Sequence, residues 1–270
     1  MRGRWEIALI AVGCIVWLVG CGSNSAKRPT AVASTAASST PKAPTHTANR
    51  EASKSPQQVL ADAASALRGA DGYELQGTIT EGGQQLQLQL LVDARQSLEM
   101  KATIGGTAYQ VLRGPLASYV RGNASFWTRH LGARGAVLAN RWIRTSTAAG
   151  LSALGNFEPA TMARCLAEDH GTLSIAGTTS VNGQRAIVLR DAGNLPGTQP
   201  GKLAVATTGP PYPLRLTATG HQRSGGRIDV CNNGRASTYY QGTLTFSRYD
   251  RVPPIQAPTH AIQSPGATNA

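Results

Sequence analysis

Aromatic and acidic residues are scarce in this sequence. Only 5% of its 270 residues are aromatic, and 14 acidic residues stand against 26 lysines and arginines, so the formal net charge is +12. The sequence also has no Gly-x-Ser-x-Gly elbow, no His-Glu-x-x-His pair and no phosphate-binding glycine-rich loop. Without a catalytic signature, we expect a protein that is not an enzyme and that holds no cofactor.

Histidine and cysteine are not arranged as metal ligands. Two of the five histidines lie in segments that are expected to be flexible, and the other three do not stand at ligand spacing from each other. A cluster formed by Cys165, Glu168, Asp169 and His170 is better explained by solvated residues at the end of a helix than by a metal site. We therefore predict no metal centre.

Long hydrophobic runs are absent except at the amino terminus. Arg2 and Arg4 precede an apolar run, residues 7–19, which is shorter than the roughly 20 residues that a helix needs to span a bilayer. The run leads into Leu18-Val19-Gly20-Cys21, which resembles the lipobox of bacterial lipoproteins. The resemblance implies that residues 1–20 are a signal peptide, cleaved before Cys21, and that the Cys21 thiol carries diacylglycerol. An uncleaved anchor helix and an ordinary signal peptide are the alternatives.

Cysteine is scarce in the rest of the chain. Once Cys21 is acylated, only Cys165 and Cys231 follow the signal peptide. Two cysteines in an exported chain most simply form one disulfide, which typically stabilises a fold by about 2–4 kcal/mol. Two free buried thiols or a metal pair are the alternatives.

Large apolar residues are almost absent from residues 22–54. Ser, Thr, Ala and Pro dominate there, and Val32 is the only large aliphatic residue. Such a segment cannot bury enough apolar surface to fold, so residues 21–54 are expected to form a disordered tether. The proline-rich residues 253–270 are expected to form an extended tail. The folded domain is therefore predicted to span residues 55–252.

Hydrophobic periodicity within this domain predicts an α+β fold. Ser55-Pro56-Gln57-Gln58 has the pattern of a capping box, and apolar residues follow it at helical spacing. Further along, the period changes to two, and short strands separated by Gly-Gly and Asn-Gly turns predict two antiparallel meanders with about ten strands. Between the meanders a second helix is expected from Pro159, and one of its sides carries Met162, Cys165 and Leu166.

Three segments resemble a known family. They are a Gly-Asn-x-x-Phe-Trp motif at residues 122–127, the pair Arg141-Trp142, and the closing segment Phe246–Val252. In their order along the chain they resemble the actinobacterial envelope lipoproteins of the LppX/LprA/LprF/LprG group, which share the half-barrel of the LolA-type lipoprotein carriers. The resemblance implies a curved antiparallel sheet, covered on one side by helices, around an apolar cavity that holds acyl chains in members of the family.

The candidate ligand-binding residues are apolar, because a pocket for a flexible chain is lined mainly by apolar side chains. We expect Phe126, Trp127 and Trp142 to line such a pocket, together with Leu88 and Leu90 of the first meander. Ordinary core packing is the alternative for these side chains.

A second candidate site is basic. No acidic residue lies between Lys101 and Phe157, a stretch that is rich in arginine. Arginine binds phosphate through two parallel hydrogen bonds. We therefore expect Arg121, Arg129, Arg141 and Arg144 to face the membrane or the phosphate of a bound lipid. A solvated surface without a partner is the alternative.

These observations predict a monomeric lipoprotein that is anchored in the cell membrane on its extracytoplasmic face. It would bind or carry a lipid, a lipoglycan or a lipoprotein acyl chain. A structural or protein-interaction lipoprotein without a ligand cavity is the alternative. Because an exported chain meets little nucleic acid, we do not assign the positive charge to nucleic-acid binding.

Overall fold

A computed structural model describes residues 47–81, 83–145, 157–168, 170–221, 223 and 239–263. The predicted signal peptide, Cys21 and most of the predicted tether lie outside these residues. So do Cys231 and residues 227–231, for which the sequence predicts a strand.

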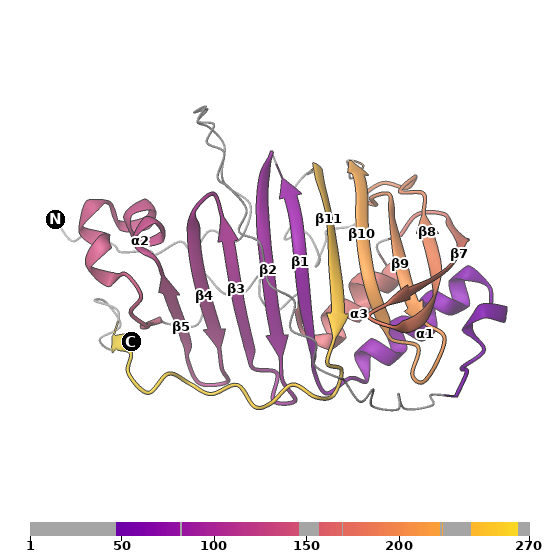
Figure 1. Ribbon diagram of the computed structural model, residues 1–270, viewed down its shortest axis with the longest axis horizontal. Helices are drawn as coiled ribbons and strands as arrows, with labels where there is room; N and C mark the ends of the chain where they lie inside the picture. Colours follow the sequence, from indigo (N-terminus) through magenta and orange to yellow (C-terminus); the bar gives the residue numbers. More distant parts are fainter. Residues whose placement is uncertain are drawn as a thin grey trace, which may run out of the picture.

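The described residues form a single twelve-stranded sheet, three α-helices and two 3₁₀ helices (Figure 1). In chain order the elements are η1 (Glu51–Ser53), α1 (Pro56–Arg68), β1 (Tyr73–Glu81), β2 (Gln84–Val92), β3 (Leu98–Ile104), β4 (Thr107–Arg113), β5 (Ser118–Gly122), α2 (Ala124–Leu131), η2 (Ala133–Leu138), β6 (Ile143–Thr145), α3 (Pro159–Glu168), β7 (Leu173–Val181), β8 (Gln184–Asp191), β9 (Gly201–Ala206), β10 (Pro213–His221), β11 (Tyr239–Ser247) and β12 (Ile262–Gln263). Among these residues, no helix combines the length and the apolar character that a membrane crossing requires.

The sheet consists of two meanders that β11 joins. Its strand order is β12-β6-β5-β4-β3-β2-β1-β11-β10-β9-β8-β7, so β11 lies between the first strand of the domain and β10. All neighbours are antiparallel except β12 and β6. The edge strands β12 and β7 do not pair with each other, so the sheet stays open. The predicted curved antiparallel sheet with helices is therefore confirmed.

The number of strands differs from the prediction of about ten because two very short strands escape detection in the sequence. β6 has three residues and β12 has two. Their pairing depends on where the chain is carried in three dimensions, and a periodicity of two cannot be recognised over so few residues.

The capping box predicted for the first helix is present. The backbone N–H of Gln58 donates to Ser55 Oγ at 3.3 Å, and the backbone N–H of Ser55 donates to Gln58 Oε1 at 3.0 Å. Pro56 occupies the first helical position, where its missing N–H has no intrahelical partner in any case. The apolar side of α1 is buried against the sheet, as its spacing predicts.

Two glycine-containing turns set the register of their hairpins as predicted. Gly105 and Gly106 have φ values of 51° and 75°, and Asn182 and Gly183 have values of 50° and 80°. Positive φ at both central residues is typical of the two-residue turns that match the twist of antiparallel strands. The β3–β4 and β7–β8 pairings follow from these turns.

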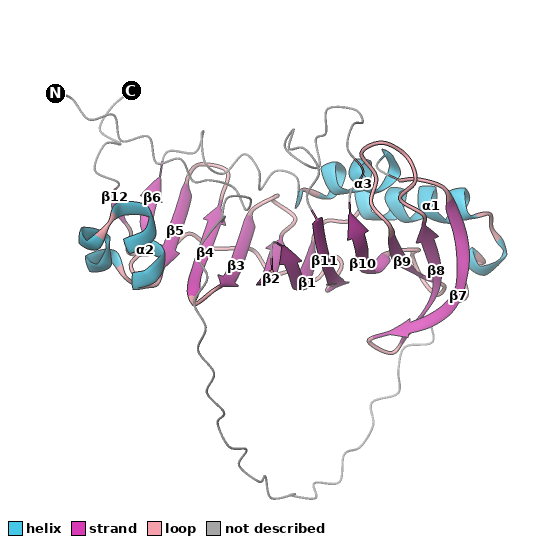
Figure 2. Cartoon of the chain, turned by 90° about the horizontal axis from the view of Figure 1, so that it is seen from above, coloured by secondary structure: helices cyan, strands magenta, loops and turns pink. Residues whose placement is uncertain are grey.

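The two faces of the sheet differ in polarity. On β2, Leu86, Leu88 and Leu90 are buried, whereas the neighbouring Gln85 and Gln87 are exposed. The buried side, called the helix face here, packs against side chains of α1, α2 and α3. Figure 2 shows α1 and α3 lying along the sheet near β8 to β10, whereas α2 contacts β4 and β5. The opposite side is called the polar face.

The folded part begins earlier than the predicted boundary at residue 55. Ala48 forms a bridge with Thr208, and the Asn49 side chain donates to the backbone carbonyls of Ala206 and Gly209, both at 2.9 Å. Glu51 is only 1% exposed. Residues 47–54, predicted as part of the tether, are therefore part of the fold. The prediction failed here because hydrogen bonds, rather than large apolar side chains, attach this segment.

The C-terminal tail is extended, as its prolines indicate, but it also joins the sheet. From β11 it runs along one edge of the strands to β6 at the far end (Figure 1). There Ile262 pairs with Ile143 in parallel, and the Ile262 N–H donates to the Trp142 carbonyl at 2.9 Å. The tail therefore covers the exposed edge of β6.

Candidate functional site

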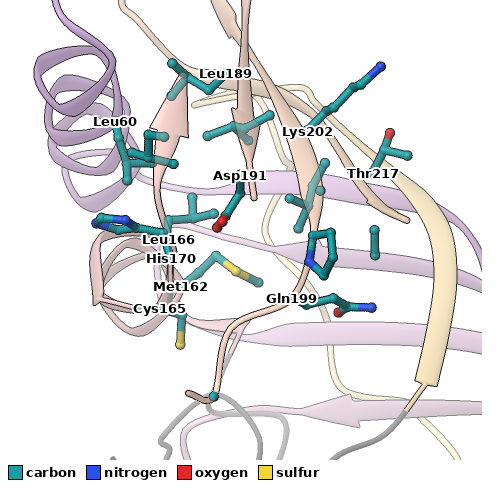
Figure 3. Close-up of a pocket in the computed structure, with 17 residues that line it drawn as sticks. Leu60, Met162, Cys165, Leu166, His170, Leu189, Asp191, Gln199, Lys202 and Thr217 are labelled. Atoms are coloured by element: carbon teal, nitrogen blue, oxygen red, sulfur yellow. The ribbon is translucent and has the colours of Figure 1, made fainter. Parts of the chain in front are cut away.

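A pocket of about 240 Å³ lies between the helices α1 and α3 and the strands β8, β9 and β10 (Figure 3). Its walls are mainly apolar. Leu60 comes from α1, and Met162 and Leu166 come from α3. The sheet contributes Leu189, Leu203 and Leu216.

The pocket lies where one row of the sheet carries a glycine and an alanine in place of large side chains. Leu189, Leu203 and Leu216 stand opposite one another on neighbouring strands and form an apolar row. In the next row on the same face, Gly201 pairs with both Asp191 and Ala218. Gly201 and Ala218 fill little of the space between the sheet and the helices, so the pocket is deeper at this row.

The pocket also lies where two core clusters meet. One cluster joins Val59 and Leu60 of α1 to strands β7, β8 and β9, and the other contains the apolar residues of β1 to β5. Leu166 and Leu216 are partly buried and pack against both clusters. Incomplete packing at this seam leaves room for an apolar group.

The polar residues around the pocket are mostly engaged elsewhere. Asp191 Oδ1 accepts hydrogen bonds from the backbone N–H groups of Gly171 and Gly193, at 2.9 and 2.7 Å. The side chains of Lys202 and Thr217 point away from the helices (Figure 3). The pocket can therefore accommodate an apolar group.

Cys165 lies in the pocket wall on α3, next to Met162 and Leu166. Its predicted partner, Cys231, lies outside the described residues, so the disulfide remains a prediction. No group of three or more His, Cys, Asp or Glu side chains in the described part of the chain is placed to hold a metal ion. Asp169, a member of the cluster weighed as a metal site, is outside the described residues.

Four of the predicted ligand-binding residues lie in the packed core instead of this pocket. Leu88 and Leu90 are 7% and 0% exposed, and Phe126 and Trp127 are both 4% exposed. The Phe126 ring stacks on Tyr109 with centroids 5.2 Å apart and meets the Trp127 ring edge-on at 5.0 Å. Gly122 lies directly beneath Phe126, where a Cβ atom would collide with the ring. Their role in ligand binding remains a prediction, and the structure places them in the core.

Trp142 does not share the environment of Phe126 and Trp127. It precedes Ile143, which is buried on the helix face opposite Val120. The side chain of Arg121, the residue after Val120, places its guanidinium carbon 6.0 Å from the centre of the Trp142 ring. Since side chains alternate along strands, Trp142 and Arg121 belong to the polar face. The structure therefore does not bring the three aromatic side chains together.

The predicted phosphate-binding arginines all lie at one end of the sheet and are exposed. Arg121 and Arg144 are on β5 and β6, Arg129 is on α2, and Arg141 precedes β6. Within the described residues, none of the four forms an ion pair, whereas Arg113 nearby pairs with Glu158 at 2.5 Å. Burial and the neighbouring positive charge of Arg129 lower the pKa of His130 on α2.

Sequence reasoning missed most of the pocket. It grouped Met162, Cys165 and Leu166 on one side of a helix, and all three line the pocket. The floor depends on the register of β8, β9 and β10, which places Gly201 beside Ala218. A glycine at the start of one strand and an alanine within another gave no separate signal in the sequence.

Comparison with solved structures finds similar folds. The lipoprotein LppX of Mycobacterium tuberculosis is 12% identical, covering 74% of this chain and 97% of LppX, with a TM-score of 0.47. LprF of Mycobacterium bovis is 12% identical, covering 77% of this chain and 100% of LprF, with a TM-score of 0.46. A LolA superfamily protein of Nitrosomonas europaea is 13% identical, covering 72% of this chain and 92% of that protein, with a TM-score of 0.26. LppX and LprF are two of the proteins after which the group that the sequence resembles is named.

No protein-family model matches the sequence, and no curated protein is significantly similar to it.

Proposed function

We propose that this protein is a lipid-anchored, extracytoplasmic lipoprotein that binds an apolar chain in the pocket between α1, α3 and the sheet. The observation that supports this function is the apolar pocket itself, with Leu60, Met162 and Leu216 among its walls. Its ligand would be an acyl chain of an envelope lipid, lipoglycan or lipoprotein.

The size of the pocket fits part of one chain. Pockets for small molecules typically span roughly 300–1,000 Å³, and this one measures about 240 Å³. Burial of hydrocarbon is worth about 0.8 kcal/mol per methylene, so eight buried methylenes would contribute about 6 kcal/mol before the cost of immobilising the chain. Binding would be passive and reversible, and no covalent step would be involved.

The anchor would be the acylated thiol of Cys21, at the end of the lipobox-like segment. Labelling of producing cells with radioactive palmitate tests this part alone. We expect label in the wild-type protein and none in a Cys21→Ala variant. Equal label in both would contradict acylation at Cys21 without bearing on the pocket.

The pocket is tested by filling it. Ala218 lies in the side-chain-poor row under the helices, so Ala218→Phe places a ring where the ligand would lie. We expect the affinity for tritiated palmitic acid to fall at least tenfold, because displacing two methylenes costs about 1.6 kcal/mol. The assay uses the chain from residue 22 onward, without an acyl group, so that the anchor does not interfere.

Thr243→Phe is the matched control for this substitution. Thr243 lies on β11 opposite Thr217, its hydroxyl is 3.3 Å from that of Thr217 on the polar face, and it does not line the pocket. We expect this variant to bind palmitic acid as the wild type does. If both variants or neither lost affinity, the pocket would not be the binding site.

A second function is supported by the filled core beneath β1 to β5. Leu90, Leu98 and Val120 are almost completely buried there by the protein's own side chains. A lipoprotein that only supports other envelope components needs no cavity. Absence of palmitic acid binding by the wild-type chain would favour this alternative.

A further inference from the structure

A cluster of arginines marks one end of the molecule. Arg121, Arg129, Arg134, Arg141 and Arg144 surround α2, η2, β5 and β6, and this set is called the arginine end here. All five arginines are exposed. No acidic residue occurs between residues 101 and 157. Within the described residues, no carboxylate pairs with any of the five. The end therefore has an excess of positive charge that the described residues do not neutralise.

Apolar side chains accompany these arginines. Val137 in η2 is 73% exposed, between Arg134 and Arg141 in the sequence. Trp142 is half-buried, and Arg121 covers one side of its ring. Tryptophan with cationic neighbours is typical of the interface between water and a bilayer, where the ring enters the headgroup layer and the cations contact phosphate.

We propose that the arginine end is a docking surface for an anionic lipid bilayer. The guanidinium groups would bind lipid phosphates, and Val137 and Trp142 would enter the headgroup layer. Arginine suits this role because its fork of donors matches two phosphate oxygens at once. The surface is separate from the pocket, which lies under α1 and α3 at the other half of the sheet.

The arginine end and the segment that leads to the proposed anchor at Cys21 lie at two different places on the domain. The chain enters the fold at Ala48, beside Thr208 after β9. β9 and β5 are seven strand positions apart, which corresponds to roughly 34 Å at the usual spacing between strands. Residues 21–47 can extend to about 90 Å, so an anchored Cys21 does not prevent the arginine end from reaching the same bilayer. This step rests on the proposed acylation of Cys21, and the docking surface itself does not.

The test measures vesicle binding by the chain from residue 22 onward without an acyl group. The probes are vesicles of pure phosphatidylcholine and vesicles that contain phosphatidylglycerol at about one lipid in three. The substitutions Arg121→Gln, Arg129→Gln, Arg141→Gln and Arg144→Gln are combined in one variant. A basic residue near an anionic surface contributes about fivefold in affinity, so we expect the variant to bind anionic vesicles at least 50-fold more weakly.

The matched control removes four charges from the other half of the molecule. It combines Arg68→Gln, Arg164→Gln, Arg185→Gln and Arg190→Gln, all at exposed positions on α1, α3 and β8. Charges more than about 10 Å from a surface are largely screened at 0.1 M salt, so this control should lose less than threefold. Circular dichroism of both variants should match the wild type.

Three results would overturn the proposal. They are equal binding of the wild type to neutral and anionic vesicles, equal loss in the two variants, and binding that does not weaken between 0.05 and 0.5 M salt. As a second readout, Trp142→Phe should remove most of the shift in tryptophan fluorescence that anionic vesicles induce. Palmitic acid binding should be the same in all of these variants, which distinguishes failure of the docking surface from failure of the pocket.

Discussion

Asp93 and Ile255 are 162 residues apart in the sequence, yet Asp93 Oδ2 accepts a hydrogen bond from the Ile255 backbone N–H at 2.8 Å. The other carboxylate oxygen of Asp93 accepts from the backbone N–H groups of Arg95 and Ser97, both at 2.9 Å. Asp93 is 1% exposed. One buried carboxylate therefore closes the β2–β3 turn and also fastens the C-terminal tail along the sheet.

Asp93→Asn should release the tail and leave the turn intact. An asparagine offers one carbonyl oxygen, which can still accept from Arg95 and Ser97, while its NH₂ group faces the N–H of Ile255. Loss of a buried acceptor costs about 1–3 kcal/mol. We expect urea unfolding to show a loss of that size, and hydrogen exchange to show faster exchange of the Ile255 amide.

Asp71→Asn is the control for this variant, because Asp71 is exposed. Its stability should match that of the wild type. Slow exchange of the Ile255 amide in Asp93→Asn would contradict the role given to this carboxylate.

The start of α1 depends on the hydroxyl of Ser55. Ser55→Ala removes the acceptor for the Gln58 N–H and should lower the free energy of unfolding by about 1 kcal/mol. Ser65→Ala makes the same change at an exposed position within the helix, where alanine is the better helix former. Urea unfolding should therefore show a loss for the first variant and none for the second, and equal effects would argue against the cap.

The pKa of His130 should depend on Arg129. Burial, followed by the charge of Arg129, lowers this pKa below its ordinary value of 6.5, and the His130 ring lies 4.5 Å from that of Phe126. Arg129→Gln should raise the pKa only part of the way, because burial remains. NMR titration of the histidine ring protons measures the change, and Arg190→Gln, on β8, should leave it unaltered.

The sign of the linked effect on stability follows from this lowered pKa. The unfolded chain binds this proton more readily than the folded chain does, so the contribution of His130 to stability is fully present above pH 6.5 and declines as the pH falls below it. Arg129→Gln should reduce this decline. A steeper decline in the variant would contradict the assigned cause.

The predicted Cys165–Cys231 disulfide can be tested by mass spectrometry of the alkylated protein. Without reduction, alkylation under denaturing conditions should add no label to either cysteine of the chain from residue 22 onward. Reduction should lower the free energy of unfolding by about 2–4 kcal/mol, and a Cys165→Ser, Cys231→Ser variant should not respond to reduction. Labelling of both thiols before reduction would show that the disulfide is absent.

Local signals in the sequence predicted the local structure well. The capping box at Ser55 and the Asn182-Gly183 turn are both present, because each depends on residues only two or three positions apart. The alternation of leucine and glutamine in β2 likewise predicted which face is buried. These features need no information from distant parts of the chain.

Features that depend on distant contacts were predicted poorly. The attachment of Ala48 to Thr208 and of Ile262 to Ile143 relies on short stretches of backbone that the fold brings together. Trp142 was grouped with Phe126 by residue type, although alternation next to the buried Ile143 places it on the other face. The pocket was missed for a similar reason, since its floor results from the pairing of Gly201 with Ala218.

The central claim, that an apolar chain binds under α1 and α3, is tested most directly by photo-crosslinking. A fatty acid with a diazirine group on its chain would be bound to the protein, irradiated, and located by mass spectrometry of peptides. We expect crosslinks on α3 around Met162 and Leu166 and on β10 around Leu216. These crosslinks should be lost in Ala218→Phe and retained in Thr243→Phe. Crosslinks confined to the core residues Leu88, Leu90, Phe126 and Trp127, or spread over the surface, would contradict the account.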